Sequence, residues 1–270
     1  MDEEHYRQAG RLLAKAWLEE TTIDMPAELL PEDREAAYAT QDEMAQQLAI
    51  EPANSAIGWK VGATSLGVQE AEGYDGPIPG RIFASSVYGN GATVSHTRCL
   101  PAKAEAEIAF RFVSAPFQQD YPFNQERLAD IVNVLPAFDI TGTRYSPSCR
   151  AGWDGRQNML AGIADNGNGG VIVLGAEAAF GRGIELMQLA VELRVNDGEP
   201  APNLWDDSRG DPLAALAWTV NHVYERGFVI NAGDVFLTGS LTEPLALEPG
   251  DLVECSMPGL GNLSCQVSRA

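Results

Sequence analysis

Apolar residues in the first fifty positions recur at helical spacing. Residues 3–20 carry one such stripe, made of Leu12, Leu13, Ala16 and Trp17. After a break at Pro26 and Pro31, residues 32–48 carry a second stripe, made of Ala36, Ala37, Ala45 and Leu48. Because this spacing is typical of amphipathic helices and proline interrupts them, we predict two helices in a small helical lobe over residues 1–55.

Beyond residue 55 the pattern changes to short apolar runs separated by Gly, Pro and Asn, which is typical of strands. The runs lie at residues 57–62, 91–95, 104–113, 134–140, 170–175, 187–195, 233–238, 251–257 and 262–268. Two helices are predicted among them, over residues 124–133 and 212–226, the second with Asp211 as its N-cap. This mixture predicts an α+β fold built around β-sheets, with residues 56–270 as one β-rich domain.

Two polar segments between these runs predict tight turns. Asn196-Asp-Gly198 is a hairpin signature after the strand that ends at Val195. Asp75-Gly-Pro-Ile-Pro-Gly80 predicts a compact turn in a loop over the functional site.

The strand predicted around residues 104–113 carries two carboxylates on one face. Side chains alternate along a strand, so Glu105 and Glu107 point the same way, roughly 7 Å apart, and the intervening even positions form an apolar face. Two like charges that close repel each other unless a cation or solvent separates them. The pair is therefore either the solvated face of an edge strand or a site for a hard divalent cation.

A third carboxylate, Asp139, lies inside the apolar run 135–140. A buried ionised acid is costly unless it is paired or bound to a metal. Asp139 either forms a salt bridge, for instance with Arg144, or joins Glu105 and Glu107 as a metal ligand. Three carboxylates are typical of a Mg²⁺ or Mn²⁺ site with positions open for substrate, and the scattered histidines lack the spacing of a zinc site.

Lys60 is a lysine within an apolar strand. Alternation places it on the same face as Gly58 and Gly62, which leaves open space around its ammonium group. It either reaches solvent by snorkelling, or it binds a carboxylate or moves a proton with a pKa lowered by burial and a nearby cation.

Two loops of small polar residues are candidates for binding an anion. Residues 164–170 offer backbone amides but match neither a dinucleotide fingerprint nor a P-loop. Residues 237–242 place three hydroxyl groups near a glycine. A tight turn and a loop of internally bonded hydroxyls are the respective alternatives.

Composition narrows the classes of partner. The formal net charge of −20 makes a nucleic acid or an anionic membrane surface an unsuitable partner. The polar amino terminus and the lack of a long apolar run predict a cytoplasmic protein without a signal peptide or a membrane span. The cysteines, none in a Cys-x-x-Cys pair, are expected to be reduced thiols: Cys99, Cys149, Cys255 and Cys265.

A series of short motifs covers nearly the whole chain in one order. They are Gly58-Trp-Lys-Val-Gly-Ala-Thr-Ser65, Pro77 to Gly80, Ala104-Glu-Ala-Glu-Ile-Ala-Phe110, Leu135-Pro-Ala-Phe-Asp139, Ala164-Asp-Asn166, Gly210-Asp-Pro-Leu213 with Ala217-Trp218, Ala232-Gly-Asp234 with Leu237-Thr-Gly-Ser240, and Pro249-Gly-Asp251. In this order they resemble the 2-oxopent-4-enoate hydratase family of the fumarylacetoacetate hydrolase superfamily, which includes 4-oxalocrotonate decarboxylases.

The resemblance implies a mixed β-sandwich roll with a helical amino-terminal lobe, assembled as a homo-oligomer. It implies a 2-oxo acid substrate that chelates Mg²⁺ or Mn²⁺, with Lys60 as the catalytic lysine. The positions that match the metal ligands are Glu105, Glu107 and Asp139, and the residues expected to contact substrate are Ile78, Arg144, Asn166 and Ser240.

The chain departs from the family pattern at three positions. Asp139 stands where the third ligand is usually Glu, Ile78 stands where many hydratases carry an acid, and Gly167-Asn168-Gly169 stands where a serine-containing stretch is usual. We therefore expect a metal-dependent hydratase of a small 2-hydroxydienoic or 2-oxo-enoic acid from aromatic degradation. The alternatives are a 4-oxalocrotonate-type decarboxylase, an acylpyruvate C–C hydrolase, and an inactive protein of the same fold that binds a 2-oxo acid.

Overall fold

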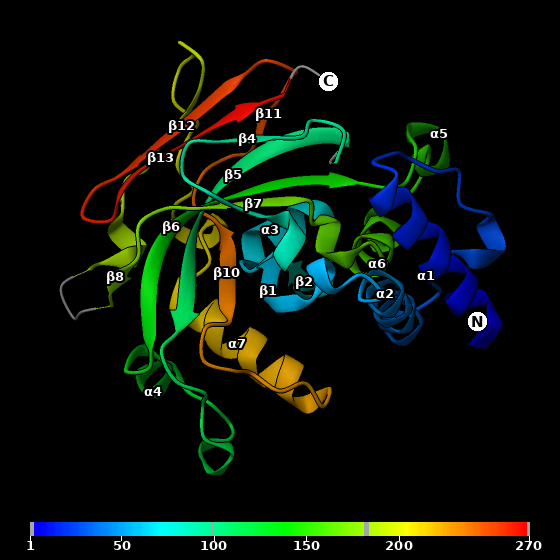
Figure 1. The fold of residues 1–270 in the computed structure, drawn as a ribbon, viewed down its shortest axis with the longest axis horizontal. Helices are drawn as coiled ribbons and strands as arrows, with labels where there is room; N and C mark the ends of the chain where they lie inside the picture. Colours follow the sequence, from blue (N-terminus) through cyan, green and yellow to red (C-terminus); the bar gives the residue numbers. More distant parts are fainter. Residues whose placement is uncertain (1–2, 99, 181–183, 269–270) are drawn as a thin grey trace.

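Two β-sheets form the centre of the molecule, and helices lie beside and below them (Figure 1). The structure is a computed structural model that describes residues 3–98, 100–180 and 184–268. The α-helices are α1 Glu3–Leu18, α2 Arg34–Leu48, α3 Leu66–Glu72, α4 Gln125–Ala129, α5 Pro147–Arg150, α6 Gly155–Ala164 and α7 Pro212–Glu225.

The strands follow the mixed topology that the α+β prediction requires. They are β1 Ala56–Gly62, β2 Ile78–Phe83, β3 Val87–Gly89, β4 Ala92–Val94, β5 Leu100–Phe112, β6 Val132–Thr143, β7 Val171–Leu174, β8 Ala178–Ala179, β9 Glu192–Val195, β10 Val235–Ser240, β11 Leu245–Ala246, β12 Leu252–Met257 and β13 Gly261–Val267. The main sheet has the order β2-β1-β10-β5-β6-β7-β3, with β11 paired to β5 and β8 to β6. The smaller sheet has the order β4-β13-β12-β9.

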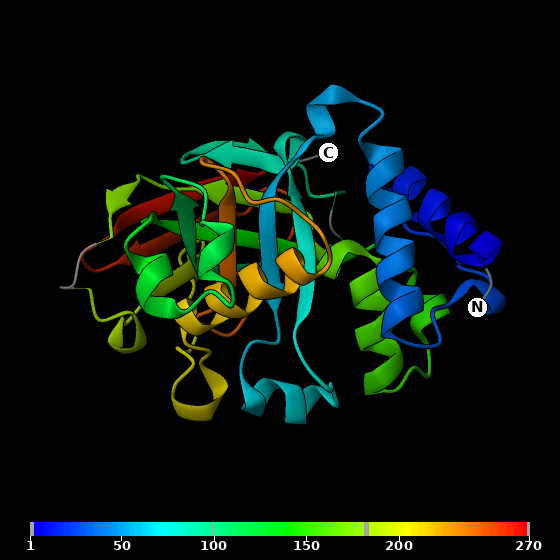
Figure 2. The same cartoon turned by 90° about the horizontal axis from the view of Figure 1, so that it is seen from below.

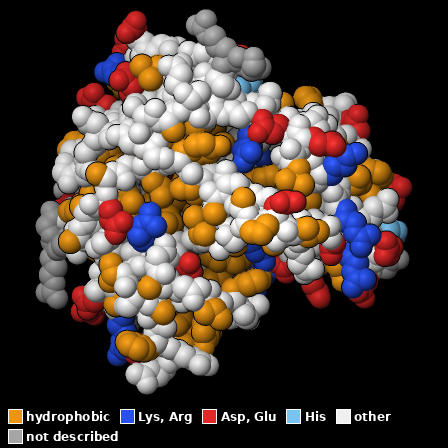
Figure 3. Space-filling view, in the orientation of Figure 1, with side chains coloured by type: hydrophobic (Ala, Val, Ile, Leu, Met, Phe, Trp, Pro, Cys, Tyr) orange, Lys and Arg blue, Asp and Glu red, His pale blue; other side chains and the backbone are white. Residues whose placement is uncertain are grey.

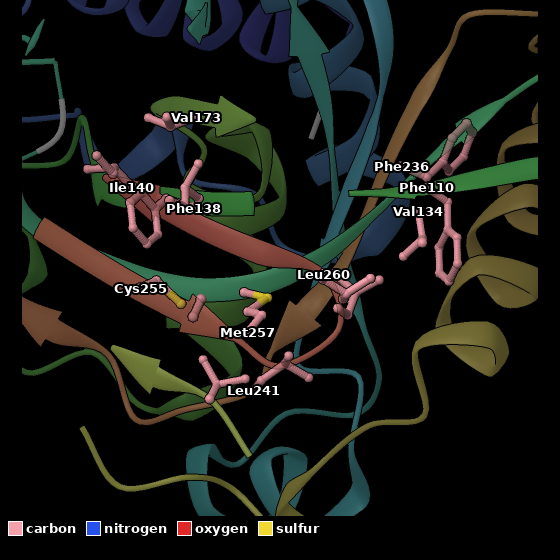
Figure 4. Packing of buried hydrophobic residues seen from close by; sticks show 14 of the residues in the cluster. Phe110, Val134, Phe138, Ile140, Val173, Phe236, Leu241, Cys255, Met257 and Leu260 are labelled. Carbon is pink, nitrogen blue, oxygen red and sulfur yellow. The ribbon is translucent and has the colours of Figure 1, made fainter. Parts of the chain in front are cut away.

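The largest apolar core lies on one face of the main sheet (Figure 4). The even positions of β5 from Ala102 to Phe112 are buried there, as the alternation predicts. The smaller sheet covers part of this face with Cys255 and Met257, and α7 covers another part with Leu216 and other apolar residues. The opposite face of the main sheet is consequently the one that carries the odd positions of β5.

The main sheet curls until its two ends meet. A second apolar cluster joins Ile82 of β2, at one end of the strand order, to Ile172 of β7, near the other end. Asn166, just before β7, completes the closure: its side chain accepts a hydrogen bond from the Arg81 amide (2.7 Å) and donates one to the Arg81 carbonyl (2.9 Å). The odd positions of β5 therefore face into a roll.

The helical lobe packs against one side of this roll (Figure 2). Helices α1 and α2 form as predicted, and Asp33 caps α2 by accepting a hydrogen bond from the Ala36 amide. Buried residues of α6 share the core of the lobe, so the lobe also contains a helix from the middle of the chain. None of the described helices is both long and apolar enough to cross a membrane.

Three local predictions are wrong. The helix predicted over residues 124–133 ends at Ala129, because the chain enters β6 at Val132. The Asn196 turn forms, but β9 pairs with the distant β12 instead of making a hairpin. The expected turn over residues 75–80 gives way to β2 at Ile78, an edge strand that tolerates Pro79 because an edge has one unpaired side.

The described cysteines Cys149, Cys255 and Cys265 are free, as predicted, and Cys99 lies outside the described residues.

Replacing Asn166 with alanine should destabilise the closed roll. The change leaves the buried Arg81 amide and carbonyl without partners, which costs about 2 kcal/mol or more. Asn168→Ala is the matched control, because both residues have a positive φ (56° and 53°) and the Asn168 side chain makes no hydrogen bond within the described chain. Urea unfolding should show the larger loss for Asn166→Ala; equal losses would contradict the closure.

Candidate active site

The register of β5 and β6 brings three carboxylates together inside the roll. Glu105 pairs with Asp139 across the two strands, and Glu107 follows two positions along β5 on the same face. One oxygen from each of the three side chains lies within 4.8 Å of the others. Asp139 and Glu107 are buried, whereas Glu105 is half-buried. The alternative of a solvated edge-strand face is therefore wrong.

Lys60 reaches the same group of carboxylates from β1. Its Nζ lies 2.5 Å from Oδ2 of Asp139 and donates a hydrogen bond of 2.9 Å to the Gly167 carbonyl. The side chain is buried, so Lys60 does not snorkel to solvent. The cation beside Asp139 is thus Lys60, and the expected alternative of an Asp139–Arg144 salt bridge is wrong.

Burial of like charges perturbs every acid in this cluster. Burial, together with the Asp139 carboxylate, raises the pKa of Glu105 to about 7 despite the opposing charge of Lys60. Burial and the neighbouring carboxylates raise the pKa of Glu107 well above its usual range, and burial also raises the pKa of Asp139. Burial alone would lower the pKa of Lys60, but the carboxylates outweigh it and the pKa is raised.

The cluster is better suited to binding a hard divalent cation than to remaining without one. Neither oxygen of Asp139 has a well-directed hydrogen bond within the described chain, although both are buried. Fully ionised, the three acids and Lys60 carry two net negative charges. An all-oxygen donor set with this charge is what Mg²⁺ and Mn²⁺ prefer, so the residues present could hold such an ion.

One backbone and one side-chain hydrogen bond hold the two glutamates in place. A bulge in β10 next to Gly239, whose φ of +98° favours glycine, directs its amide to Oε2 of Glu107 at 2.8 Å. On the other side, the Thr141 hydroxyl donates to Oε1 of Glu105 at 3.3 Å. Each glutamate therefore retains a free oxygen for a ligand.

A cavity of about 400 Å³ opens onto this cluster. Lys60 and Glu105 line it, and so do two of the predicted substrate contacts, Ile78 and Ser240. The Ser240 hydroxyl donates to the Thr242 carbonyl at 2.6 Å. The volume suits a small organic acid.

The other two predicted contacts lie behind the cavity wall. Arg144 is buried and donates hydrogen bonds to Asp165 (2.6 Å from Nε to Oδ1) and to the Gly169 carbonyl (2.6 Å). The Asn166 side chain is hydrogen-bonded to the backbone of Arg81. Both residues shape the turn whose Gly167 carbonyl holds Lys60, and direct contact of either with substrate stays a prediction.

Sequence reasoning overlooked several residues of the site. Nothing in the sequence marked Asp165 as the ion-pair partner of Arg144, except its place beside Asn166 in the chain. Lys103 could have been found, because it lies two positions before Glu105 and hence on the same strand face. Arg150 and Tyr74 enter the cavity wall from a short helix and a loop that no pattern predicted.

Comparison with known proteins places the chain in a family. Residues 70–268 match the model of the fumarylacetoacetate hydrolase C-terminal family. The chain belongs to this family. It is 32% identical over 228 residues to a 2-keto-4-pentenoate hydratase of Paraburkholderia xenovorans, covering 84% of this chain and 81% of that protein. It is also 30% identical to a 2-hydroxyhexa-2,4-dienoate hydratase of Comamonas testosteroni, covering 79% and 78% of the two chains.

Solved structures support the predicted roll. The 4-oxalocrotonate decarboxylase of Pseudomonas putida G7, complexed with magnesium and adipate, superposes with a TM-score of 0.85 at 23% identity, covering 99% of this chain and 98% of that one. At this identity the likeness concerns the fold. The prediction of an α+β roll with a helical amino-terminal lobe is confirmed.

Replacing a buried carboxylate by its amide should separate metal binding from folding. Glu107→Gln keeps an oxygen that can accept from the Gly239 amide but removes one buried negative charge. Because unpaired buried charge is costly, the metal-free variant should unfold at a higher temperature than the wild type. Its affinity for Mn²⁺, measured by calorimetry, should be lost, and Glu105→Gln should lose it as well.

Glu192→Gln, on the edge strand β9 of the smaller sheet and exposed, is the matched control and should change neither property. Unchanged Mn²⁺ affinity in the Glu107 and Glu105 variants would overturn the assignment of these ligands.

Proposed function

We propose that this protein is a divalent-metal-dependent hydratase that acts on a small 2-hydroxydienoic or 2-oxo-enoic acid of aromatic degradation. The observation that carries the proposal is the buried set of three carboxylates beside Lys60 on the wall of one cavity. Identity of about 30% to hydratases over most of the chain supports it. We also propose Mg²⁺ or Mn²⁺ as the ion, a homo-oligomeric assembly and a cytoplasmic location.

In the proposed reaction, Glu105, Glu107 and Asp139 would hold the ion. When bound there, it would supply Lewis-acid stabilisation of the negative charge that develops on the 2-oxygen of the substrate. The chain contributes the rest of the site: Ile78 and Ser240 border the cavity.

Lys60 is placed to hold and move the proton. Its Nζ is fixed between Asp139 and the Gly167 carbonyl, at the edge of the cavity. Interconversion of dienol and ketone takes a proton from the enol oxygen and places one on carbon. Water then adds to the conjugated 2-oxo-enoate, with its hydroxyl on the distal carbon and its proton on the neighbouring carbon. A positioned group that carries these protons raises the rate by roughly 10²–10⁴-fold.

A decarboxylase is the second candidate, and Ile78 favours it. Ile78 borders the cavity at the position where many hydratases are expected to carry an acid. Loss of CO₂ from a 2-oxo diacid needs the same stabilisation of charge on the 2-oxygen but no activated water. The two reactions therefore differ in the mass of their products.

The deciding experiment is product analysis with freshly made 2-hydroxypenta-2,4-dienoate and 2-oxohex-3-enedioate in the presence of Mg²⁺ or Mn²⁺. Metal-dependent gain of one water would support the hydratase, and metal-dependent loss of CO₂ from the diacid would support the decarboxylase. Survival of both substrates, with EDTA making no difference, would contradict both and favour a binding protein.

Lys60→Met should lower kcat by at least about 100-fold, because the proton carrier is removed. Mn²⁺ should still bind, since the three carboxylates remain. Lys15→Met, an exposed lysine of α1, is the control and should retain wild-type turnover. Near-wild-type kcat in the Lys60 variant would exclude the proposed role.

A further inference from the structure

Nearly all the described basic side chains of this acidic protein form an ion pair or a hydrogen bond. On the face drawn in Figure 3, most Lys and Arg side chains lie beside Asp or Glu side chains. Within the described chain, each Lys and Arg has an ion pair with a carboxylate or a hydrogen bond to a carbonyl, with two exceptions. The exceptions are Lys103 and Arg150.

These two free cations border the same cavity as the carboxylate cluster. Lys103 comes from β5 and Arg150 from the end of α5, and both line the cavity of about 400 Å³. Both also line an adjoining hollow of about 160 Å³ that shares Tyr74, Thr141 and Asn168 with it. Segments far apart in the chain thus converge on one end of the cavity with unpaired positive charge.

The distance of this end from the carboxylates sets the length of a ligand. Lys103 lies two residues before Glu105 on the same face of β5, which is roughly 7 Å along a strand. A ligand whose 2-oxo acid end lies at the carboxylate cluster would reach Lys103 and Arg150 with the end of a short chain.

We propose that Lys103 and Arg150 form a subsite for a second carboxylate, so that the preferred ligand is a short 2-oxo dicarboxylic acid. The proposal rests on the proposed function for the placement of the 2-oxo end. Lysine and arginine donate charge-assisted hydrogen bonds to carboxylates, and arginine can do so in a bidentate manner. Glu72 is an acidic neighbour that lines the same cavity, and it opposes this preference.

The test compares two ligands that differ only at the distal end. 2-Oxoadipate and 2-oxohexanoate share the chelating end and the chain length, but the first ends in a carboxylate and the second in a methyl group. Calorimetry with the Mn²⁺-saturated full-length protein should show about tenfold tighter binding of the diacid, the usual contribution of a charged hydrogen bond. Turnover is not needed for this measurement.

Variants assign the preference to the two cations. Lys103→Gln and Arg150→Gln should each weaken 2-oxoadipate several-fold, and the double variant should bind both ligands equally. Arg156→Gln is the matched control, since Arg156 is exposed, lies near Arg150 in the chain and bonds to the Glu32 carbonyl outside the cavity. Glu72→Gln should increase the preference for the diacid.

Equal affinity of the wild type for both ligands would overturn the subsite, and so would a double variant that weakens both ligands alike. The subsite and the proposed function can be supported or contradicted independently of each other. Diacid preference without turnover of any dienoic acid would support the subsite and contradict the hydratase. Turnover of the monoacid dienoate with no diacid preference would do the reverse.

Discussion

The structure depends on the burial of more negative than positive charge at one point in a β-sheet. Glu105, Glu107 and Asp139 meet on the inner face of the roll, and Lys60 is the ammonium group placed among them. Burial of unbalanced charge opposes folding, and the raised pKa values of the three acids express that cost. A protein that keeps such a cluster gains from it only when something positive binds there.

The rest of the fold keeps this cluster in place while leaving one side accessible. The pairing of β5 with β6 sets Glu105 opposite Asp139, and the Gly239 bulge holds Glu107. Closure of the roll through Asn166 brings the Gly167 carbonyl to Lys60. The cavity then admits a small ligand to Glu105 and Lys60, while Glu107 and Asp139 stay buried behind them.

Much of this arrangement could be predicted from local patterns. Alternation along a strand was enough to place Glu105 and Glu107 on one face and Lys60 beside glycines, and the capping residue Asp211 marked α7. The partners of buried groups could not be predicted. The ion pairs Arg144–Asp165 and Lys60–Asp139 join segments that come together only in the folded roll. Helix α6 was missed because its polar residues come first and its apolar residues follow in one run, so it has no amphipathic period.

The most direct test of the account is anomalous diffraction from crystals soaked in Mn²⁺. One strong peak is expected inside the roll, with an oxygen of each of Glu105, Glu107 and Asp139 bound directly to the ion and further positions open toward the cavity. Lys60 should remain within hydrogen-bonding distance of the cluster. A peak elsewhere, or none while Lys60 and Asp139 keep their ion pair undisturbed, would contradict the claim that these buried carboxylates are held for a divalent cation.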